Sequence, residues 1–190
     1  IHHKLMGELN QSIEHAKKTV DFWPVAYYPF YMKRTETGAG LEDLYDREQI
    51  EQDWEQLREA VKQQNEAGYP MFMGYEWQGS GEDGDHNVFF LDNEQPMLHP
   101  MRYEELYQAY KDRPAIAIPH HVAYQLGSRG KNWETHREAF SPFAEIYSSH
   151  GCSENDTGPF DMERHLHMGP RTGESCYESG LEKGYLVGMI

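Results

Sequence analysis

The chain has little cysteine and no long hydrophobic run. Its 190 residues include two cysteines, Cys152 and Cys176, without the paired spacing of a disulfide-rich domain. This excludes a disulfide framework and favours a reducing compartment, so we expect a cytoplasmic protein. No apolar stretch approaches the roughly 20 residues that a bilayer-spanning helix needs. We therefore expect no membrane-spanning segment.

Positive charge is also scarce. The chain has 17 Lys and Arg residues against 32 Asp and Glu residues, and its formal net charge is -15 at pH 7. Binding to nucleic-acid phosphates needs clustered Lys and Arg, and an acidic surface disfavours anionic membranes. We therefore expect no nucleic-acid or membrane partner and predict a small-molecule substrate. The sequence leaves the oligomeric state open.

The length predicts one domain with a substantial core. The chain begins at Ile1 in a strand-like segment, and residues 188–190 resemble the start of a further buried strand. No clear domain boundary lies between these ends. We therefore expect a single domain over residues 1–190 that is truncated at both ends.

Hydrophobic spacing predicts several helices and strands. Residues 8–18 have apolar side chains on one helical face, and a second helix is predicted after Asp46, a candidate N-cap. The apolar face of this second helix comprises Ile50, Trp54, Leu57 and Val61. Residues 28–45 resemble a long loop. Strands are predicted at residues 1–5, 21–27, 71–76, 86–91, 115–118 and 143–147.

Strands and helices mostly alternate, and several strands lack alternation of polar and apolar residues. This pattern is typical of a parallel sheet that is covered on both faces, so it predicts the α/β class. In such a sheet or barrel the carboxyl ends of the strands meet on one face, where ligands bind. Residues with metal-binding side chains at those ends are therefore candidates for one shared site.

Such residues follow three of the predicted strands. Glu76 ends one strand, His120 and His121 follow another, and His150 follows the strand that carries Glu145. Imidazole and carboxylate groups suit Zn, Mn or Fe. These positions predict a divalent metal centre.

Each of these residues also has a simpler interpretation. Glu76 at the end of a buried strand needs a partner, which could be a metal or an Arg in a salt bridge. Successive side chains of an extended chain point in opposite directions, so we expect His120 to face the site and His121 to contact substrate or cap a turn. Glu145 could be an ion-paired strand residue. His86 opens a strand after a Gly-rich loop, which is either solvated or folded back towards the site.

Five segments carry a resemblance to a known family, namely residues 20–28, 74–77, 85–90, 118–121 and 144–151. In these segments the chain resembles the PHP (polymerase and histidinol phosphatase) superfamily of metal-dependent hydrolases, in a branch of unknown function. The resemblance implies a distorted (β/α)7 barrel of PHP type, incomplete in this chain. It also implies one to three divalent ions (Zn, Mn or Fe) at the carboxyl ends of the strands.

The resemblance further assigns individual residues. It implies that Glu76 is the bridging glutamate, that His120 is the histidine of the family's His-Pro motif, with His121 in place of proline, and that His150 lies near a later histidine ligand. On the first strand, His2 is the expected metal ligand, although Lys4 stands where its imidazole partner would be. The family's Thr-Asp-His is replaced by residues 26–28, so Tyr28 is expected to line the pocket in place of a ligand.

The sequence thus predicts a hydrolase of a phosphoester or related anionic ester that uses metal-activated water. Its expected ligands are His2, Glu76, His120 and His150, its catalytic residues His121 and His86, and its substrate contacts Tyr28 and Glu145. One alternative is a metal-independent glycoside hydrolase that uses Glu76 and Glu145 as paired carboxylates. Another is a non-catalytic binding module on a degenerate PHP scaffold.

Overall fold

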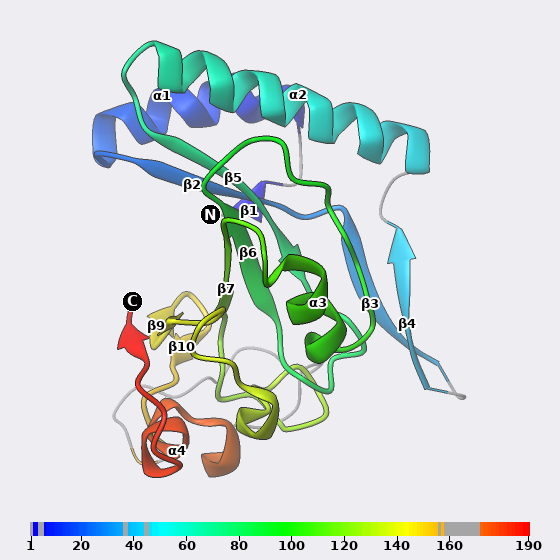
Figure 1. Cartoon of the computed structure of the whole chain (residues 1–190), viewed down its shortest axis with the longest axis vertical. Coiled ribbons are helices and arrows are strands. Elements are labelled where there is room, and N and C mark those ends of the chain that lie inside the picture. The colour runs from blue at the N-terminus through cyan, green and yellow to red at the C-terminus, as the bar shows by residue number, and fades with distance from the viewer. Residues whose placement is uncertain (1, 4–5, 36–37, 44–45, 156, 158–171) are drawn as a thin grey trace.

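The protein is built on a mixed sheet with helices on one side and a group of short elements beyond its last strand (Figure 1). A computed structural model describes residues 2–3, 6–35, 38–43, 46–155, 157 and 172–190. Its α-helices are α1 (Leu9–Thr19), α2 (Arg47–Glu66), α3 (Tyr103–Tyr110) and α4 (Tyr177–Glu182). The strands of the main sheet are β1 (His2–His3), β2 (Trp23–Tyr27), β5 (Met71–Trp77), β6 (His86–Phe90) and β7 (Ala115–Pro119). The α/β class predicted from the sequence is confirmed.

The main sheet has the strand order β1-β2-β5-β6-β7 and is not fully parallel. Strands β1, β2 and β5 are parallel, whereas β6 is antiparallel to both β5 and β7. The prediction of an all-parallel sheet is therefore wrong at β6. Only residues 78–85 join β5 to β6, and this is shorter than the crossover of about a dozen residues that a parallel connection needs.

The strands in the described part of the chain do not close into a barrel. Strand β1 pairs only with β2, and β7 pairs only with β6 in this sheet. Beyond β7 the predicted strand at residues 143–147 is divided into β8 (Phe143–Ala144) and β9 (Tyr147–Ser148). Strand β8 pairs with β11 (Gly188–Met189), and β9 pairs with β10 (Gly151–Cys152). The mixed sheet is therefore an open one as far as the structure describes it.

Helices α1 and α2 run along the same side of the sheet (Figure 1). The side chain of Asp46 accepts a hydrogen bond from the backbone N–H of Gln49 at 2.9 Å, as predicted for an N-cap. The predicted apolar face of α2 is buried in the main core with the apolar face of α1 and the strands β2 and β5. The core thus follows the helical period of the sequence.

Residues 28–45 contain a β-hairpin instead of the predicted loop. Strand β3 (Phe30–Thr35) pairs in antiparallel register with β4 (Gly38–Asp43). Aromatic and β-branched residues in the first strand favour this conformation, and the glycines at 38 and 40 concealed the second strand. The loop prediction was wrong because the second strand, whose own propensity for strand is low, forms by pairing with the first.

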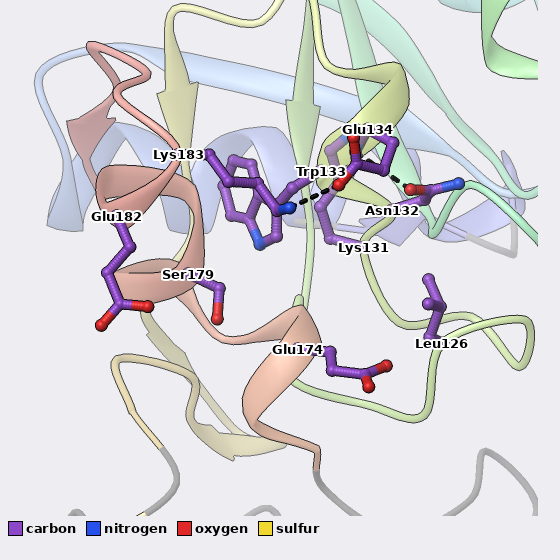
Figure 2. A pocket seen from close by; sticks show the side chains of 9 residues that line it. All are labelled: Leu126, Lys131, Asn132, Trp133, Glu134, Glu174, Ser179, Glu182 and Lys183. Carbon is purple, nitrogen blue, oxygen red and sulfur yellow. Dashed lines mark hydrogen bonds and ion pairs between the residues drawn. The ribbon is translucent and has the colours of Figure 1, made fainter.

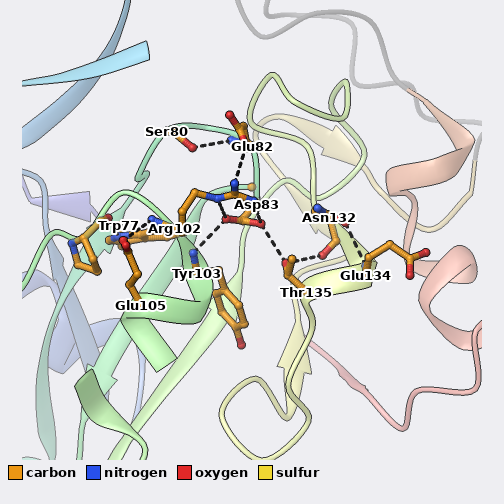
Figure 3. Close-up of polar contacts among 12 residues, drawn as sticks. Trp77, Ser80, Glu82, Asp83, Arg102, Tyr103, Glu105, Asn132, Glu134 and Thr135 are labelled. Atoms are coloured by element: carbon orange, nitrogen blue, oxygen red, sulfur yellow. Dashed lines mark hydrogen bonds and ion pairs between the residues drawn. The ribbon is translucent and has the colours of Figure 1, made fainter. Parts of the chain in front are cut away.

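Asp83 anchors the connection between β5 and β6 (Figure 3). Its carboxylate accepts hydrogen bonds from Arg102 Nε at 2.8 Å, from the Tyr103 backbone N–H at 3.0 Å and from Thr135 Oγ1 at 3.0 Å. Burial by itself raises the pKa of Asp83, but these hydrogen bonds and the charge of Arg102 outweigh it and lower the pKa below its usual range. Asp83 therefore joins this loop to the start of α3 and to the loop that follows β7.

We expect Asp83→Asn to lower the free energy of unfolding by about 1–3 kcal/mol at pH 7, because the charged acceptor of these hydrogen bonds is lost. Since the folded pKa of Asp83 is depressed, its stabilisation is present above the pKa of the unfolded chain, near 4, and is lost as the pH falls. Urea denaturation at pH 7 and at pH 3 measures this difference.

The matched control is Glu82→Gln, because Glu82 also pairs with Arg102 but is 57% exposed. An exposed ion pair contributes about 0–1 kcal/mol, so this variant should stay close to the wild type. An Asp83→Asn cost that is the same at both pH values would contradict the assignment.

Candidate metal centre

Three strands of the sheet end or begin at one edge. Trp77 at the end of β5 is in register with His86 at the start of β6, and His86 is in register with Pro119 at the end of β7. Because β6 runs antiparallel, its first residue reaches the edge at which its neighbours finish. Glu76, His86 and His120 therefore lie at the same edge of the sheet.

Three histidines form a close group beside this edge. The ring centroids of His120 and His121 are 4.0 Å apart, those of His121 and His150 4.6 Å apart, and those of His120 and His150 5.5 Å apart. One nitrogen from each ring lies within 4.8 Å of the other two. His120 and His150 were expected at one site from the sequence, and the structure brings them together.

His121 was expected to be catalytic or to contact substrate, and the structure places its ring beside that of His120. In an extended chain, neighbouring side chains would point in opposite directions. The backbone φ of His121 is +39°, so the chain turns at this residue into the left-handed region. The turn places two successive imidazoles on one side.

Glu145 orients His120. Its Oε2 lies 2.9 Å from His120 Nδ1, and its Oε1 accepts a hydrogen bond from the His121 backbone N–H at 3.1 Å. An ionised carboxylate only accepts hydrogen bonds, so Nδ1 carries the proton and Nε2 presents its lone pair. A carboxylate behind an imidazole in this way is the usual second partner of a metal-binding histidine.

Burial and charge have opposite effects on this pair. Burial lowers the pKa of His120, but the hydrogen bond and charge of Glu145 outweigh it, so the pKa of His120 is raised. Burial by itself raises the pKa of Glu145. The hydrogen bond and charge of His120 outweigh this effect and lower the pKa of Glu145 to about 2. A proton therefore competes with any metal for His120.

Asp85 has the corresponding position behind His121. Asp85 Oδ2 lies 3.3 Å from His121 Nε2. Within the described residues, Nδ1 has no hydrogen-bond partner although it is buried. Burial, and then the positive charges of His120 and Arg129, hold the pKa of His121 well below its usual value. His121 is therefore a neutral imidazole, which is the form that binds metals.

His150 completes the group from the loop between β9 and β10. Its Nδ1 lies 3.0 Å from the hydroxyl of Tyr124, which is a second partner from another loop. The three histidines match the donor set of a His₃ zinc site, in which metal–nitrogen distances of about 2.0–2.1 Å place the nitrogens about 3.3 Å apart. The residues present thus fit one transition-metal ion, with the imidazoles drawn closer together.

Glu76 lies outside this group of three. Its Oε1 accepts hydrogen bonds from Gln78 Nε2 at 2.8 Å and from Arg129 Nη2 at 3.3 Å. Tyr28 joins the same network, because Gln78 Nε2 also lies within hydrogen-bonding distance of its hydroxyl. Glu76 thus forms a salt bridge to an Arg, which was the simpler of the two interpretations of this residue. Its role as a metal ligand and the contact of Tyr28 with substrate stay predictions.

His86 is fully buried and is not part of a solvated loop. Its Nδ1 donates to the carbonyl of Gly84 at 2.9 Å, its Nε2 accepts from Lys131 Nζ at 3.3 Å, and its ring stacks on Tyr103. Burial, followed by the charge of Lys131, holds the pKa of His86 well below its usual value. Burial also lowers the pKa of Lys131 to about 7. The catalytic role of His86 stays a prediction, and the side chain of His2 lies outside the described residues.

Sequence reasoning missed Asp85, Arg129 and Tyr124. Asp85 directly precedes His86 and could have been noticed as a second carboxylate at the strand end. Burial raises its pKa to about 6, although Arg129 opposes this shift. Arg129 and Tyr124 belong to the long loop after β7, and nothing in their local sequence shows that they face the histidines.

A separate cavity of about 420 Å³ lies between this loop and the C-terminal helix (Figure 2). It is lined by Leu126, Lys131, Asn132, Trp133, Glu134, Glu174, Ser179, Glu182 and Lys183. None of these residues belongs to the three-histidine group. Lys131 lines this cavity, and its Nζ also contacts His86.

Comparison of the chain with protein families, curated proteins and solved structures found no match. In the described parts of the chain, no helix combines the length and apolar character needed to cross a membrane. The resemblance to the PHP superfamily therefore rests on the five sequence segments alone.

We expect protein purified without a histidine tag to bind one Zn²⁺ per chain at the three-histidine group. A His120→Ala/His150→Ala variant loses two ligands, so its Zn²⁺ affinity should fall by more than about 100-fold. Replacing one residue that only hydrogen-bonds a ligand typically lowers metal affinity by about 10–100-fold. Elemental analysis and calorimetric titration measure the count and the affinity. His15→Ala is the control, because His15 is exposed on α1, and equal affinity in both variants would exclude this site.

Glu145→Gln should reduce Zn²⁺ affinity by about 10–100-fold without changing the number of bound ions. The variant also removes the charge that raises the pKa of His120, so proton competition should begin at a lower pH than in the wild type. Titrations between pH 5 and 8 measure both effects. An unchanged pH dependence would show that Glu145 does not control the protonation of His120.

Proposed function

We propose that the protein is a metal-dependent hydrolase of a phosphoester or related anionic ester. The observation that supports this is the group formed by His120, His121 and His150, in which two imidazoles are backed by carboxylates. Metal-binding histidines usually have such partners. The group lies beside the sheet edge where the resemblance to the PHP superfamily expects ligands.

A divalent ion bound at this position supplies a Lewis acid and lowers the pKa of a water molecule. The chain's own residues have distinct tasks in this proposal. His120, His121 and His150 hold the ion, so we assign His121 a ligand role in addition to its expected catalytic one. Glu145 and Asp85 orient the imidazoles, and Tyr124 positions His150. Because both oxygens of Glu145 accept hydrogen bonds, Glu145 acts as a positioning residue.

We also propose that the open mixed sheet belongs to a distorted PHP-type barrel. The five sequence segments support this, because each of them has residues at one edge of the sheet or in the loops beside it. Strand β6 is the main departure from a simple alternation of strands and helices. The same proposal includes a small-molecule substrate. It also includes one ion at the three histidines, whereas the resemblance to the PHP superfamily implies up to three.

The metal-independent glycoside hydrolase has weaker support. That chemistry needs one carboxylic acid with a raised pKa. Glu145 has a pKa of about 2 beside His120, and Glu76 is bridged to Arg129. Neither glutamate is therefore poised to donate a proton at neutral pH.

Hydrolysis of p-nitrophenyl phosphate tests the proposal. Turnover should be lost on exhaustive chelation, return when Zn²⁺ or Mn²⁺ is added, and fall by at least about 100-fold in His150→Ala, because a ligand is removed. His15→Ala should behave as the wild type. Turnover that survives chelation would contradict a metal-dependent mechanism, and metal binding without hydrolysis of any ester tested would favour a binding module.

A further inference from the structure

The guanidinium of Arg129 lies between two buried carboxylates. Its Nε donates to Asp85 Oδ2 at 2.6 Å, and its Nη2 contacts the same oxygen and also Glu76 Oε1 at 3.3 Å. Glu76 is 2% exposed, Asp85 1% and Arg129 8%. Two carboxylates at this depth need a cation close to both, and Arg129 is in that position.

The loop after β7 holds Arg129 firmly in this place. The backbone of Arg129 has a φ of +77°, and its N–H donates to the carbonyl of Gly81 at 2.9 Å. A Cβ at the next residue, Gly130, would lie 1.9 Å from the carbonyl oxygen of Tyr124. The chain therefore accepts a left-handed arginine in a tightly folded loop. This conformation directs a fixed positive charge at Glu76 and Asp85.

Carboxylate oxygens that converge on one point are the ligands that Mn²⁺ and Mg²⁺ prefer. A guanidinium is permanently charged and forms paired hydrogen bonds with carboxylates, so it can neutralise the same oxygens without a metal. Asp85 also contacts His121, which joins this pair of carboxylates to the three-histidine group. The edge of the sheet thus has two adjacent positions for a positive charge.

We propose that Arg129 occupies the second of these positions as a built-in cation, so that the chain binds a single divalent ion at its histidines. The inference rests on the proposed metal at His120, His121 and His150. In this arrangement Glu76 is the ion-pair partner of Arg129, and it does not bridge two metal ions. The arrangement also means that removal of the guanidinium exposes a latent site for a carboxylate-preferring ion.

Calorimetric titration of metal-free protein with Mn²⁺, checked by elemental analysis after dialysis, tests this directly. The wild type should bind one ion per chain, Arg129→Met two, and Arg129→Lys one, because lysine keeps the charge. Adding Glu76→Gln to Arg129→Met should return the count to one. A folded Arg129→Met protein that still binds one ion would overturn the inference and leave the proposed metal centre intact.

Glu76→Gln alone is the second test, because it keeps the pair of Asp85 and Arg129 and does not depend on the folding of Arg129→Met. It should still bind one ion, with an affinity within about threefold of the wild type, which is well under the tenfold that corresponds to 1.4 kcal/mol. A loss of more than about tenfold would show that Glu76 is a ligand, and would overturn the inference. Two or more Mn²⁺ ions on the wild type would do the same, whereas binding of neither Mn²⁺ nor Zn²⁺ would overturn the proposed function as well.

Discussion

The need to neutralise two buried carboxylates governs the structure around the candidate site. Glu76 and Asp85 lie next to each other at one sheet edge, where water cannot solvate them. An isolated buried charge is far more costly than the strain of a few backbone angles. The chain therefore accepts left-handed conformations at His121 and Arg129, which bring an imidazole and a guanidinium to Asp85.

The antiparallel direction of β6 makes this arrangement possible. If β6 were parallel to β5, its first residues would lie at the opposite edge of the sheet, far from the ends of β5 and β7. The hydrogen bonds of Asp83 hold the connection in place from the other side, by linking it to α3 and to the loop that follows β7. Packing of loops against a short connection, and not the sheet alone, therefore determines where Asp85 and His86 lie.

The histidines gain their chemical character from these neighbours. His120 and His121 are adjacent in sequence, yet their pKa values shift in opposite directions, because one is backed by a hydrogen-bonded glutamate while burial and two positive charges act on the other. For His120, the hydrogen bond to Glu145 fixes which nitrogen carries the proton. The closeness of the three imidazole nitrogens, together with the carboxylates beside His120 and His121, is what suits this group to a metal ion.

Local patterns in the sequence determined helices α1 and α2, the Asp46 cap, most strand positions and the candidates Glu76, His120 and His150. Helical period, capping and apolar runs depend on residues that are near in the chain. The short connection of residues 78–85 already requires that β6 run antiparallel to β5. Tertiary structure alone decided the hairpin at β3 and β4 and the side to which His121 turns. It also decided that Asp85 and Arg129, 44 positions apart, form an ion pair. Strand pairing and the neutralisation of buried charge depend on partners that are distant in sequence, and no local pattern specifies them.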